Sequence, residues 1–388
     1  MTDAIVITGA ARTPMGGFQG DFAGVTATKL GAAAVKAATI GLQPEDVSEV
    51  IMGCVLPAGL GQAPARQASI GGGLPVSVPT TTVNKMCGSG MKAVMQGFDG
   101  LAAGTSEIVV AGGMESMTNA PYLLPKARAG LRMGHGEVKD HMFFDGLEDV
   151  YQPGRLMGSF AEEAATHYQL TRGMQDDYAL ASLSRALKAE AAGLFDAEIT
   201  PVDAGKAGLI ARDEQPGKAR PDKIPNLKPA FAKDGTVTAA NASSISDGAA
   251  ALVLTRASVA EGKGLTPLAR IIGHASHAEE PQWFTRAPVG AIRKLVGQTG
   301  WSIDQVDLFE LNEAFAVVNL IAMHELAIPH DKMNVNGGAC ALGHPIGASG
   351  ARIIVTLIHA LKQRGLKRGV AAVCIGGGEA TALALEVI

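Results

Sequence analysis

Two segments of the chain carry apolar residues at helical spacing directly after a glycine-rich run. The first extends from Gly88 to about Ala103, and the second follows Gly350. In both, apolar side chains recur every three or four residues and so line one face of a helix. These positions are Met91, Val94, Met95, Phe98 and Leu101 in the first segment and Ile353, Ile354, Leu357, Ile358 and Leu361 in the second. The pattern predicts two amphipathic helices of similar design.

Short runs rich in β-forming residues alternate with the helical patterns. Examples are EIVVAGG at 107–113 and GVAAVCIGGG at 369–378. Strands that alternate with helices indicate sheets whose two faces are both covered. The expected fold class is therefore α/β, in layers.

Four short stretches near the start of the chain reappear, in the same order, near its end. The pairs are AIVITGA (4–10) with ARIIGHA (269–275), EDVSEVIMGCV (45–55) with DQVDLFELNEA (304–314), GSGMKAV (88–94) with ASGARII (348–354), and AGGMES (111–116) with IGGGEA (375–380). All four pairs are separated by about 260 residues. Each match is weak alone, but four collinear matches predict two copies of one α/β unit.

The chain between 118 and 245 has no counterpart in the second half. It combines irregular, Pro- and Gly-rich stretches with a helical pattern around 174–192. Long insertions of this kind usually form lids or interfaces. We therefore expect three parts: an N-terminal domain of 1–117 plus 246–267, an inserted loop domain of 118–245 that binds substrate, and a C-terminal domain of 268–388.

Composition narrows the class of protein. Hydrophobic residues make up 47% of the 388 residues and charged residues 18%, with a formal net charge of -4. These values are typical of a globular protein and disfavour nucleic acid as a partner. The four cysteines match neither a disulfide framework nor a zinc site, so reduced thiols and no metal are expected. With no membrane-spanning run and no signal-peptide pattern, the expected location is the cytoplasm.

Cys87 stands directly before the first predicted helix, in VNKMCGSGMKA (83–93). The N–H groups and the positive dipole end of a helix start favour an anion, and such a position lowers the pKa of a thiol. However, free cysteine is also among the most frequently buried residues. Position alone leaves two interpretations open for Cys87, a nucleophile or a structural residue.

His344 lies between Gly343 and Pro345 in NGGACALGHPIGASG, and so outside any regular helix. It precedes the second predicted helix, at a point of the repeat equivalent to the loop of Cys87. A lone histidine is more often structural. The repeat nevertheless predicts that His344 and Cys87 face one cavity.

Two further candidates follow apolar runs near the end of the chain. Cys374 ends a predicted strand and precedes the glycines 376–378, which either form a tight turn or direct amide groups toward an oxyanion. Asn312 follows the run VDLFEL, and α/β folds place their sites at such strand ends. Asn is also a common helix N-cap.

These residues suit one chemistry. A thiolate that attacks a carbonyl needs a base and donors for the oxyanion. A second thiol is surplus for hydrolysis, but has a use if a proton must be moved at the carbon next to a thioester. Two cysteines, a histidine and an asparagine therefore favour the making or breaking of carbon–carbon bonds through an acyl-enzyme.

Five blocks together resemble the thiolase family in its order and spacing. They are NKMCGSGMKA, NASSISDGAAA, ELNEAFA, NVNGGACALGHPIGASGAR and CIGGGEA. The resemblance runs over essentially the whole chain. It implies a duplicated fold of two similar α/β domains in five αβαβα layers, with an inserted loop domain. It also implies that coenzyme A thioesters are substrates and that no separate cofactor is needed.

By this resemblance, Cys87 is the nucleophile that becomes acylated. His344 activates it and contributes to an oxyanion hole, which a water held by Asn312 completes. Cys374 takes the α-proton of the incoming acetyl-CoA, or returns it during cleavage. The backbone amides of Cys87 and Gly376 form a second oxyanion hole.

The resemblance also implies contacts with coenzyme A. The positions that match the family's pantetheine tunnel are Met157, Phe231, Ser243, Ala314 and Phe315. Lys218, Arg220 and Lys223 lie in the segment where the family meets the nucleotide end. Such residues suit phosphate oxygens, although a solvated surface explains them equally well.

One residue departs from the pattern of acetoacetyl-CoA-forming members, which usually carry His-Met-Gly in the loop domain. Here the stretch reads RLMG, with Leu156 in place of the histidine.

In contrast, the segment at 124–151 is similar to the stretch through which biosynthetic members form tetramers, so we expect a homotetramer. The predicted activity is a short-chain acetyl-CoA acetyltransferase with acetyl-CoA, 3-ketoacyl-CoA and CoA as partners. The alternative is a broader 3-ketoacyl-CoA thiolase of fatty-acid β-oxidation.

Two hypotheses from other classes remain. A decarboxylating condensing enzyme of related fold would carry a second histidine where this chain has Asn312. A non-catalytic thiolase-like protein would bind acyl-CoA or lipid without turnover.

Overall fold

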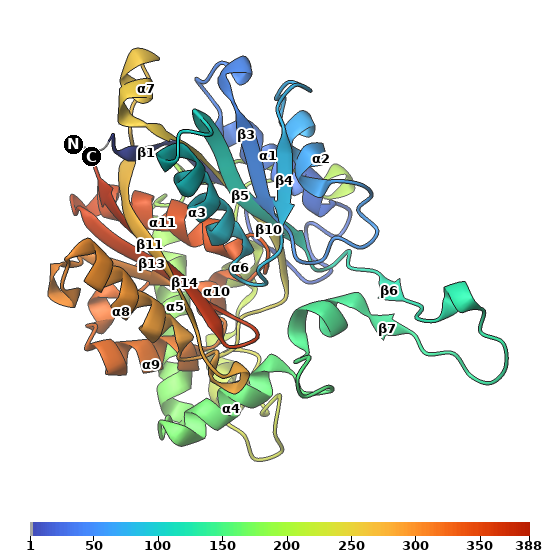
Figure 1. Cartoon of the computed structure of the whole chain (residues 1–388). Coiled ribbons are helices and arrows are strands. Elements are labelled where there is room, and N and C mark those ends of the chain that lie inside the picture. The colour runs from blue at the N-terminus through green and yellow to red at the C-terminus, as the bar shows by residue number, and fades with distance from the viewer. Residues whose placement is uncertain (1–2) are drawn as a thin grey trace.

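The computed structural model describes residues 3–388 (Figure 1). Its helices are α1 (Ala27–Ala38), α2 (Pro64–Gly71), α3 (Ser89–Ala102), α4 (Met157–His167), α5 (Arg172–Ala191), α6 (Glu214–Lys218), α7 (Ala257–Gly262), α8 (Ala287–Thr299), α9 (Ala316–Leu326), α10 (Ala339–Leu342) and α11 (Ser349–Arg364). Its strands are β1 (Ile5–Arg12), β2 (Gly16–Gly17), β3 (Glu49–Gly53), β4 (Thr80–Val83), β5 (Ile108–Ser116), β6 (Tyr122–Leu123), β7 (Lys139–Asp140), β8 (Val202–Asp203), β9 (Leu209–Ile210), β10 (Ser246–Arg256), β11 (Ala269–Ala278), β12 (Leu308–Leu311), β13 (Arg368–Ile375) and β14 (Glu379–Val387). The two helices predicted from apolar spacing are confirmed as α3 and α11.

The main sheet consists of two halves with the same pairing scheme. The strand order is β4-β3-β5-β10-β1 in the first half and β12-β13-β14-β11 in the second. In each half a parallel pair, β3–β5 or β12–β13, adjoins two antiparallel pairs. An irregularity also repeats, because the register shifts before Gly9 in one half and before Gly273 in the other. The duplication predicted from the sequence is confirmed.

Helices and half-sheets stack in five layers. Helices α3 and α11 share one apolar core with strands of both half-sheets and so form the central layer. Helices α1 and α2 cover the outer face of the first half-sheet, while α8 and α9 cover that of the second. Within residues 3–388, strand pairing joins the two half-sheets near the first residues of β1 and β11, where two residue pairs meet. Figure 1 shows this arrangement around α3 and α11.

The central helices cross closely at their N-terminal ends because both carry glycine there. A Cβ atom on Gly350 of α11 would meet the backbone nitrogen of Met91 at 2.4 Å, and one on Gly90 of α3 would meet that of Ala351 at 2.8 Å. Real Cβ atoms do not approach backbone atoms this closely. The glycines that weaken the helices locally therefore allow the two copies to pack.

Replacing Gly350 by alanine is expected to destabilise the protein by at least about 2 kcal/mol, because backbone atoms cannot move aside for the new methyl group. Gly297 in α8 is the matched control, since it is exposed and nothing lies within 4 Å of a Cβ built there. Gly297→Ala is expected to be neutral or to stabilise by up to about 1 kcal/mol. Urea unfolding of both variants tests this difference, and equal midpoints would contradict the close crossing.

The chain between β5 and β10 carries α4, α5, α6 and four short strands. The helix predicted around 174–192 is confirmed as α5. Strands β6 and β7 pair in an arm that projects away from the layers (Figure 1). The domain boundaries proposed from the sequence stay a prediction. Within residues 3–388, no helix has both the length and the apolar character needed to cross a membrane.

Candidate active site

The predicted reactive residues lie at helix starts and strand ends that the duplication brings together. Cys87 precedes α3 and His344 precedes α11, the two helices that cross at Gly90 and Gly350. Asn312 and Cys374 come from the neighbouring parallel strands β12 and β13, and the Asn312 N–H donates to the carbonyl of Ala372 at 3.0 Å. Strand ends and helix starts thus meet at one end of the second half-sheet.

The Cys87 thiol faces the turn that contains Gly376. Cys87 is partly exposed, whereas Cys374 is buried. The amide N–H groups of Gly376 and of Cys87 itself both contact the Cys87 sulfur. The loops are tightly packed, because a Cβ on Gly88 would meet the Ile375 side chain at 2.4 Å. Two amide N–H groups therefore lie next to the sulfur, which suits an oxyanion hole for a carbonyl group that this sulfur attacks.

The expectation that the helix start lowers the pKa of Cys87 is wrong. Burial raises the pKa of this thiol to about 11, and the two amide N–H groups only partly offset that effect. A thiolate loses more solvation in this site than the backbone donors return. Burial and the nearby Cys87 also raise the pKa of Cys374 well above its ordinary value. Both thiols are thus neutral at rest, and Cys87 needs a base.

His344 is available as that base because it is neutral. Burial, with a smaller effect of the Arg352 charge, lowers the pKa of the imidazole to about 3. Its backbone N–H donates to the carbonyl of Ser244 at 3.2 Å, which ties its loop to the segment before β10. An uncharged imidazole accepts a proton, whereas a protonated one does not.

Ser349 determines which ring nitrogen of His344 is basic. The Ser349 hydroxyl donates to the carbonyl of Pro345 at 3.0 Å, and its oxygen lies 2.6 Å from Nδ1 of His344. With its only hydrogen committed to Pro345, the hydroxyl accepts from Nδ1–H. The equivalent Ser89 makes the same bond in the first copy, donating to Met86 at 2.6 Å. Nε2 is therefore the nitrogen that takes a proton.

Asn312 lies beside the imidazole. Its Nδ2 is 3.4 Å from both ring nitrogens of His344. Among the residues that the structure describes, its buried Oδ1 has no hydrogen-bond partner. A buried oxygen of this kind ordinarily binds water, which fits the predicted role of Asn312. The water itself stays a prediction.

These pKa values predict the pH dependence of Cys87 alkylation by iodoacetamide. Only the thiolate reacts, so the rate is expected to rise about tenfold per pH unit between pH 7 and 9, without a plateau. No step is expected near pH 6.5, since His344 stays neutral far below that pH. Mass spectrometry of the Cys87 peptide gives the rate. A plateau above pH 7 would instead indicate a preformed thiolate–imidazolium pair.

The residues expected to contact pantetheine form a continuous wall. Met157 begins α4, and its sulfur would lie 3.4 Å from a Cβ on Gly376. The Phe231 ring covers Gly158 and packs edge-on against Phe315, with the centroids 6.0 Å apart. Ser243 joins the same wall, because its N–H donates to the carbonyl of Ala314 at 2.9 Å. The structure thus groups the five predicted residues, and Met157 is the one that lies next to Gly376.

The basic residues line a separate cavity of about 330 Å³. Lys218, Arg220 and Lys223 surround it together with Ser244 and Cys340. Lys218 is exposed and pairs with Glu214 at 2.5 Å, so part of its charge is already matched. The Ser244 carbonyl also receives the His344 N–H, and this cavity therefore adjoins the histidine loop. A phosphate contact for these residues stays a prediction.

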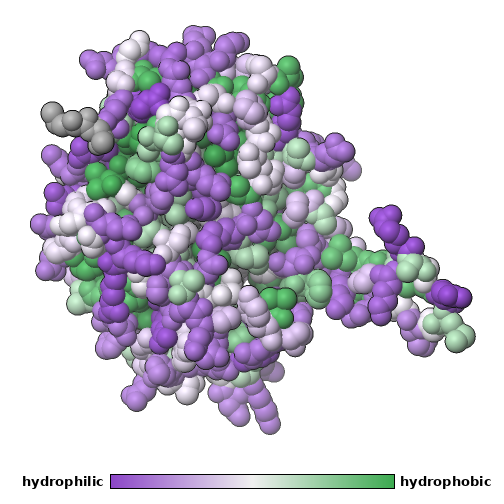
Figure 2. Space-filling model, viewed as in Figure 1, coloured by the Kyte–Doolittle hydropathy of each residue, from purple (hydrophilic) through white to green (hydrophobic). Residues whose placement is uncertain are grey.

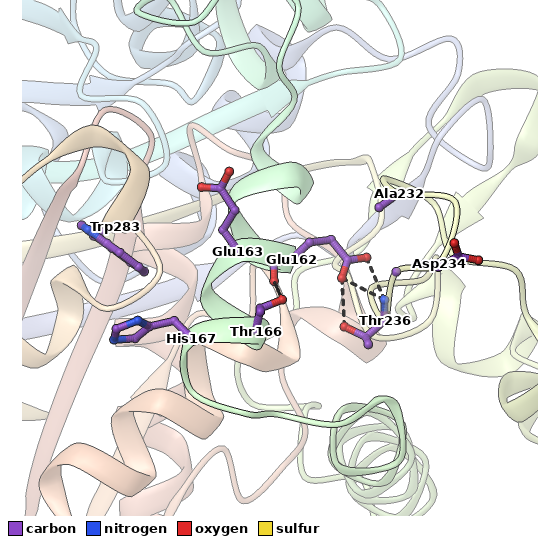
Figure 3. A pocket seen from close by; sticks show the side chains of 9 residues that line it. Glu162, Glu163, Thr166, His167, Ala232, Asp234, Thr236 and Trp283 are labelled. Atoms are coloured by element: carbon purple, nitrogen blue, oxygen red, sulfur yellow. Dashed lines mark hydrogen bonds between the residues drawn. The ribbon is translucent and has the colours of Figure 1, made fainter.

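A larger cavity, of about 540 Å³, lies between α4, the loop at 232–236 and Trp283 (Figure 3). None of the predicted site residues lines it. The Glu162 carboxylate there accepts hydrogen bonds from the backbone and hydroxyl of Thr236 and from the Val237 N–H, all at 2.8 to 2.9 Å. The Glu162 carboxylate thus fixes the loop that follows Phe231.

Sequence reasoning missed the residues that support the site. Glu313 follows Asn312, and its buried carboxylate accepts from Tyr178, Ser182 and Asn334 and from the Cys340 N–H, at 2.7 to 2.9 Å. These donors come from the insertion, from the loop before α10 and from α10 itself. The signal available in the sequence was the charged residue within an apolar block, ELNEAFA.

Metal ligation finds no support in the described part of the chain. Across residues 3–388, no three His, Cys, Asp or Glu side chains are grouped so that they could hold a metal ion. All four cysteines are free thiols.

Two family models match consecutive parts of the chain. The model of the thiolase N-terminal domain matches residues 5–258, and that of the C-terminal domain matches 265–387. Acetyl-CoA acetyltransferase 2 of Arabidopsis thaliana is 51% identical over 99% of this chain and 97% of its own length. The acetyl-CoA acetyltransferase of Cupriavidus necator is 49% identical over the full length of both proteins.

Two solved structures are similar over nearly the whole chain. The acetyl-CoA acetyltransferase of Bacillus anthracis has a TM-score of 0.96 at 41% identity, covering 100% of this chain and 99% of its own. A thiolase of Ascaris suum, solved in complex with coenzyme A, has a TM-score of 0.94 at 42% identity, covering 99% and 100%.

Proposed function

The chain belongs to the thiolase family, and from this premise we propose that it is an acetyl-CoA C-acetyltransferase. It interconverts two acetyl-CoA with acetoacetyl-CoA and CoA. The observation that carries the proposal is the set of contacts around one sulfur: Cys87 faces the amide of Gly376 and lies beside the Cys374 thiol. Relatives that are about 50% identical in sequence and are named acetyl-CoA acetyltransferase support acetyl-CoA as the substrate.

In the first half-reaction, Nε2 of His344 takes the Cys87 proton and the sulfur attacks the acetyl carbonyl of acetyl-CoA. The carbonyl π electrons move to oxygen, which the amides of Cys87 and Gly376 stabilise. Collapse of this tetrahedral intermediate breaks the bond to the CoA sulfur. CoA leaves as a thiol after it receives the proton from His344, and Cys87 is acetylated.

In the second half-reaction, the Cys374 thiol first passes its proton to Nε2 of the neutral His344, and the resulting Cys374 thiolate removes an α-proton from another acetyl-CoA. The resulting enolate oxygen accepts hydrogen bonds from His344 and from the water at Asn312. The enolate carbon attacks the acetyl group on Cys87, a carbon–carbon bond forms, and the bond to the Cys87 sulfur breaks. The Cys87 thiolate then takes the proton from His344, while Cys374 keeps the α-proton, so both thiols are restored. Because Cys374 is buried with a raised pKa, it is a strong base once ionised.

Acyl length separates this proposal from its alternative, a broad 3-ketoacyl-CoA thiolase. Leu156 precedes α4 beside Met157, and a chain-length series of 3-ketoacyl-CoA thiolysis tests the choice. Acetoacetyl-CoA is expected to exceed eight-carbon and longer substrates in kcat/KM by at least roughly tenfold. Similar values across the series would favour the broad enzyme. Turnover of malonyl thioesters, or tight binding without any turnover, would support the two other hypotheses.

We also propose that CoA phosphates meet the basic residues Lys218, Arg220 and Lys223, that the protein is a homotetramer, and that it works in the cytoplasm. The cavity lined by these basic residues supports the first point. Exposed apolar residues on the β6–β7 arm support the second, among them Met133 at 97% and Val138 at 61% exposure (Figure 2). The need for two reduced thiols supports the third. Light scattering tests the tetramer.

A further inference from the structure

Each copy of the duplicated unit contributes a glutamate that reaches into the other copy. Glu115 lies near the end of β5 in the first copy, and Glu379 begins β14 in the second. The Glu115 carboxylate accepts from the Gly347 N–H at 3.0 Å, in the loop of His344. The Glu379 carboxylate pairs with the ammonium of Lys85, two residues before Cys87. Each copy thus supplies a glutamate that holds an active-site loop of the other copy.

The Glu115 carboxylate is buried and accepts hydrogen bonds from three backbone N–H groups. Besides Gly347, the carboxylate accepts from Val55 at 2.9 Å and Leu56 at 3.1 Å, in the loop after β3. Gly347 must be glycine here, because a Cβ would meet the carboxylate at 2.6 Å. Glu115 therefore fixes the loop of His344 from the side of the first copy.

The Lys85–Glu379 contact lies next to the reactive sulfur. Glu379 is three residues after Gly376, whose N–H faces Cys87, and its backbone is held by pairing with Ile375 and Ala278. The backbone of Lys85 is also held, because its N–H donates to the hydroxyl of Ser89 at 2.8 Å, and Cys87 lies between these two residues in the sequence. The ion pair thus joins two anchored backbones on either side of the sulfur–amide contact.

We propose that these two contacts, the cross-copy clasp of Glu115–Gly347 and Lys85–Glu379, position the Cys87 thiol against the Gly376 amide and the His344 imidazole. Lys85 and Glu379 are positioning residues, and the inference rests on the proposed acyl transfer at Cys87. Their side chains are 24% and 37% exposed. A pair this exposed contributes little to global stability. The clasp therefore serves to align the reacting groups rather than to stabilise the fold.

Lys85→Met tests the exposed half of the clasp. Its kcat for acetoacetyl-CoA thiolysis is expected to fall roughly tenfold, because misplaced reacting groups lose rate steeply. The rate of Cys87 alkylation at fixed pH falls with it, while KM and the melting temperature stay unchanged. Arg270→Met is the matched control: it breaks a similarly exposed pair, Arg270–Glu386, on strands away from the site. This control is expected to keep wild-type kcat and alkylation.

The charge-swapped variant Lys85→Glu/Glu379→Lys separates a clasp from a general effect of charge. It is expected to recover kcat to within about threefold of wild type, whereas Glu379→Lys alone stays as slow as Lys85→Met. Wild-type kcat in Lys85→Met, or a double variant no faster than the single ones, would overturn the clasp. Absence of thiolysis in the unmodified protein would instead refute the proposed function.

Discussion

The Cys87→Ser variant is expected to lose thiolysis of acetoacetyl-CoA by at least about 10³-fold. A serine hydroxyl is far less acidic than the thiol, whose pKa burial already raises to about 11. The neutral His344 therefore cannot generate a useful alkoxide. The thiolester exchange that makes acylation reversible also disappears, because an oxygen ester is a poorer acyl donor to CoA.

Steady-state thiolysis and intact-protein mass spectrometry measure this loss. Coenzyme A binding, measured by calorimetry, is the control and should be unchanged, since the predicted pantetheine wall lies on other residues. Full thiolysis by Cys87→Ser would remove Cys87 from the mechanism. Loss of binding together with activity would trace the defect to folding, which far-ultraviolet circular dichroism would reveal.

Cys374→Ala is expected to separate the two half-reactions. Acetylation of Cys87 by acetyl-CoA should stay within about tenfold of wild type, because the nucleophile, His344 and the amide donors are intact. Condensation should fall by at least about 10³-fold, because no base remains to remove the α-proton. Exchange of acetyl-CoA α-protons with deuterated solvent should stop as well.

Rapid-quench measurement of the acetylated enzyme gives the first rate, and acetoacetyl-CoA formation gives the second. An equal loss of both would contradict the division of work between the two cysteines. Retained deuterium exchange would assign proton removal to another group.

The duplicated framework could be predicted from the sequence because each element leaves a local trace. The apolar spacing after Gly88 and Gly350 predicted α3 and α11, and four collinear stretches predicted the repeated strands. The five-layer arrangement with a central helical layer came instead from the resemblance to the thiolase family. The glycines at the crossing were part of the same pattern.

The electrostatics of the site could not be predicted in this way. The position of Cys87 before a helix indicated a lowered pKa. The actual pKa depends on how deeply the sulfur is buried, and this burial is a property of the folded protein. Contacts between the two copies could not be predicted from the sequence either. Nothing near Glu115 in the sequence indicates Gly347, and nothing near Glu379 indicates Lys85.

The central claim is that catalysis passes through an acyl group on Cys87. The most direct measurement is to mix the enzyme with acetyl-CoA labelled in the acetyl group, quench in acid, and map the label by peptide mass spectrometry. The account predicts label on the peptide that contains Cys87, and complete discharge when CoA is added. Label on the Cys374 peptide, or turnover without any labelled peptide, would contradict it.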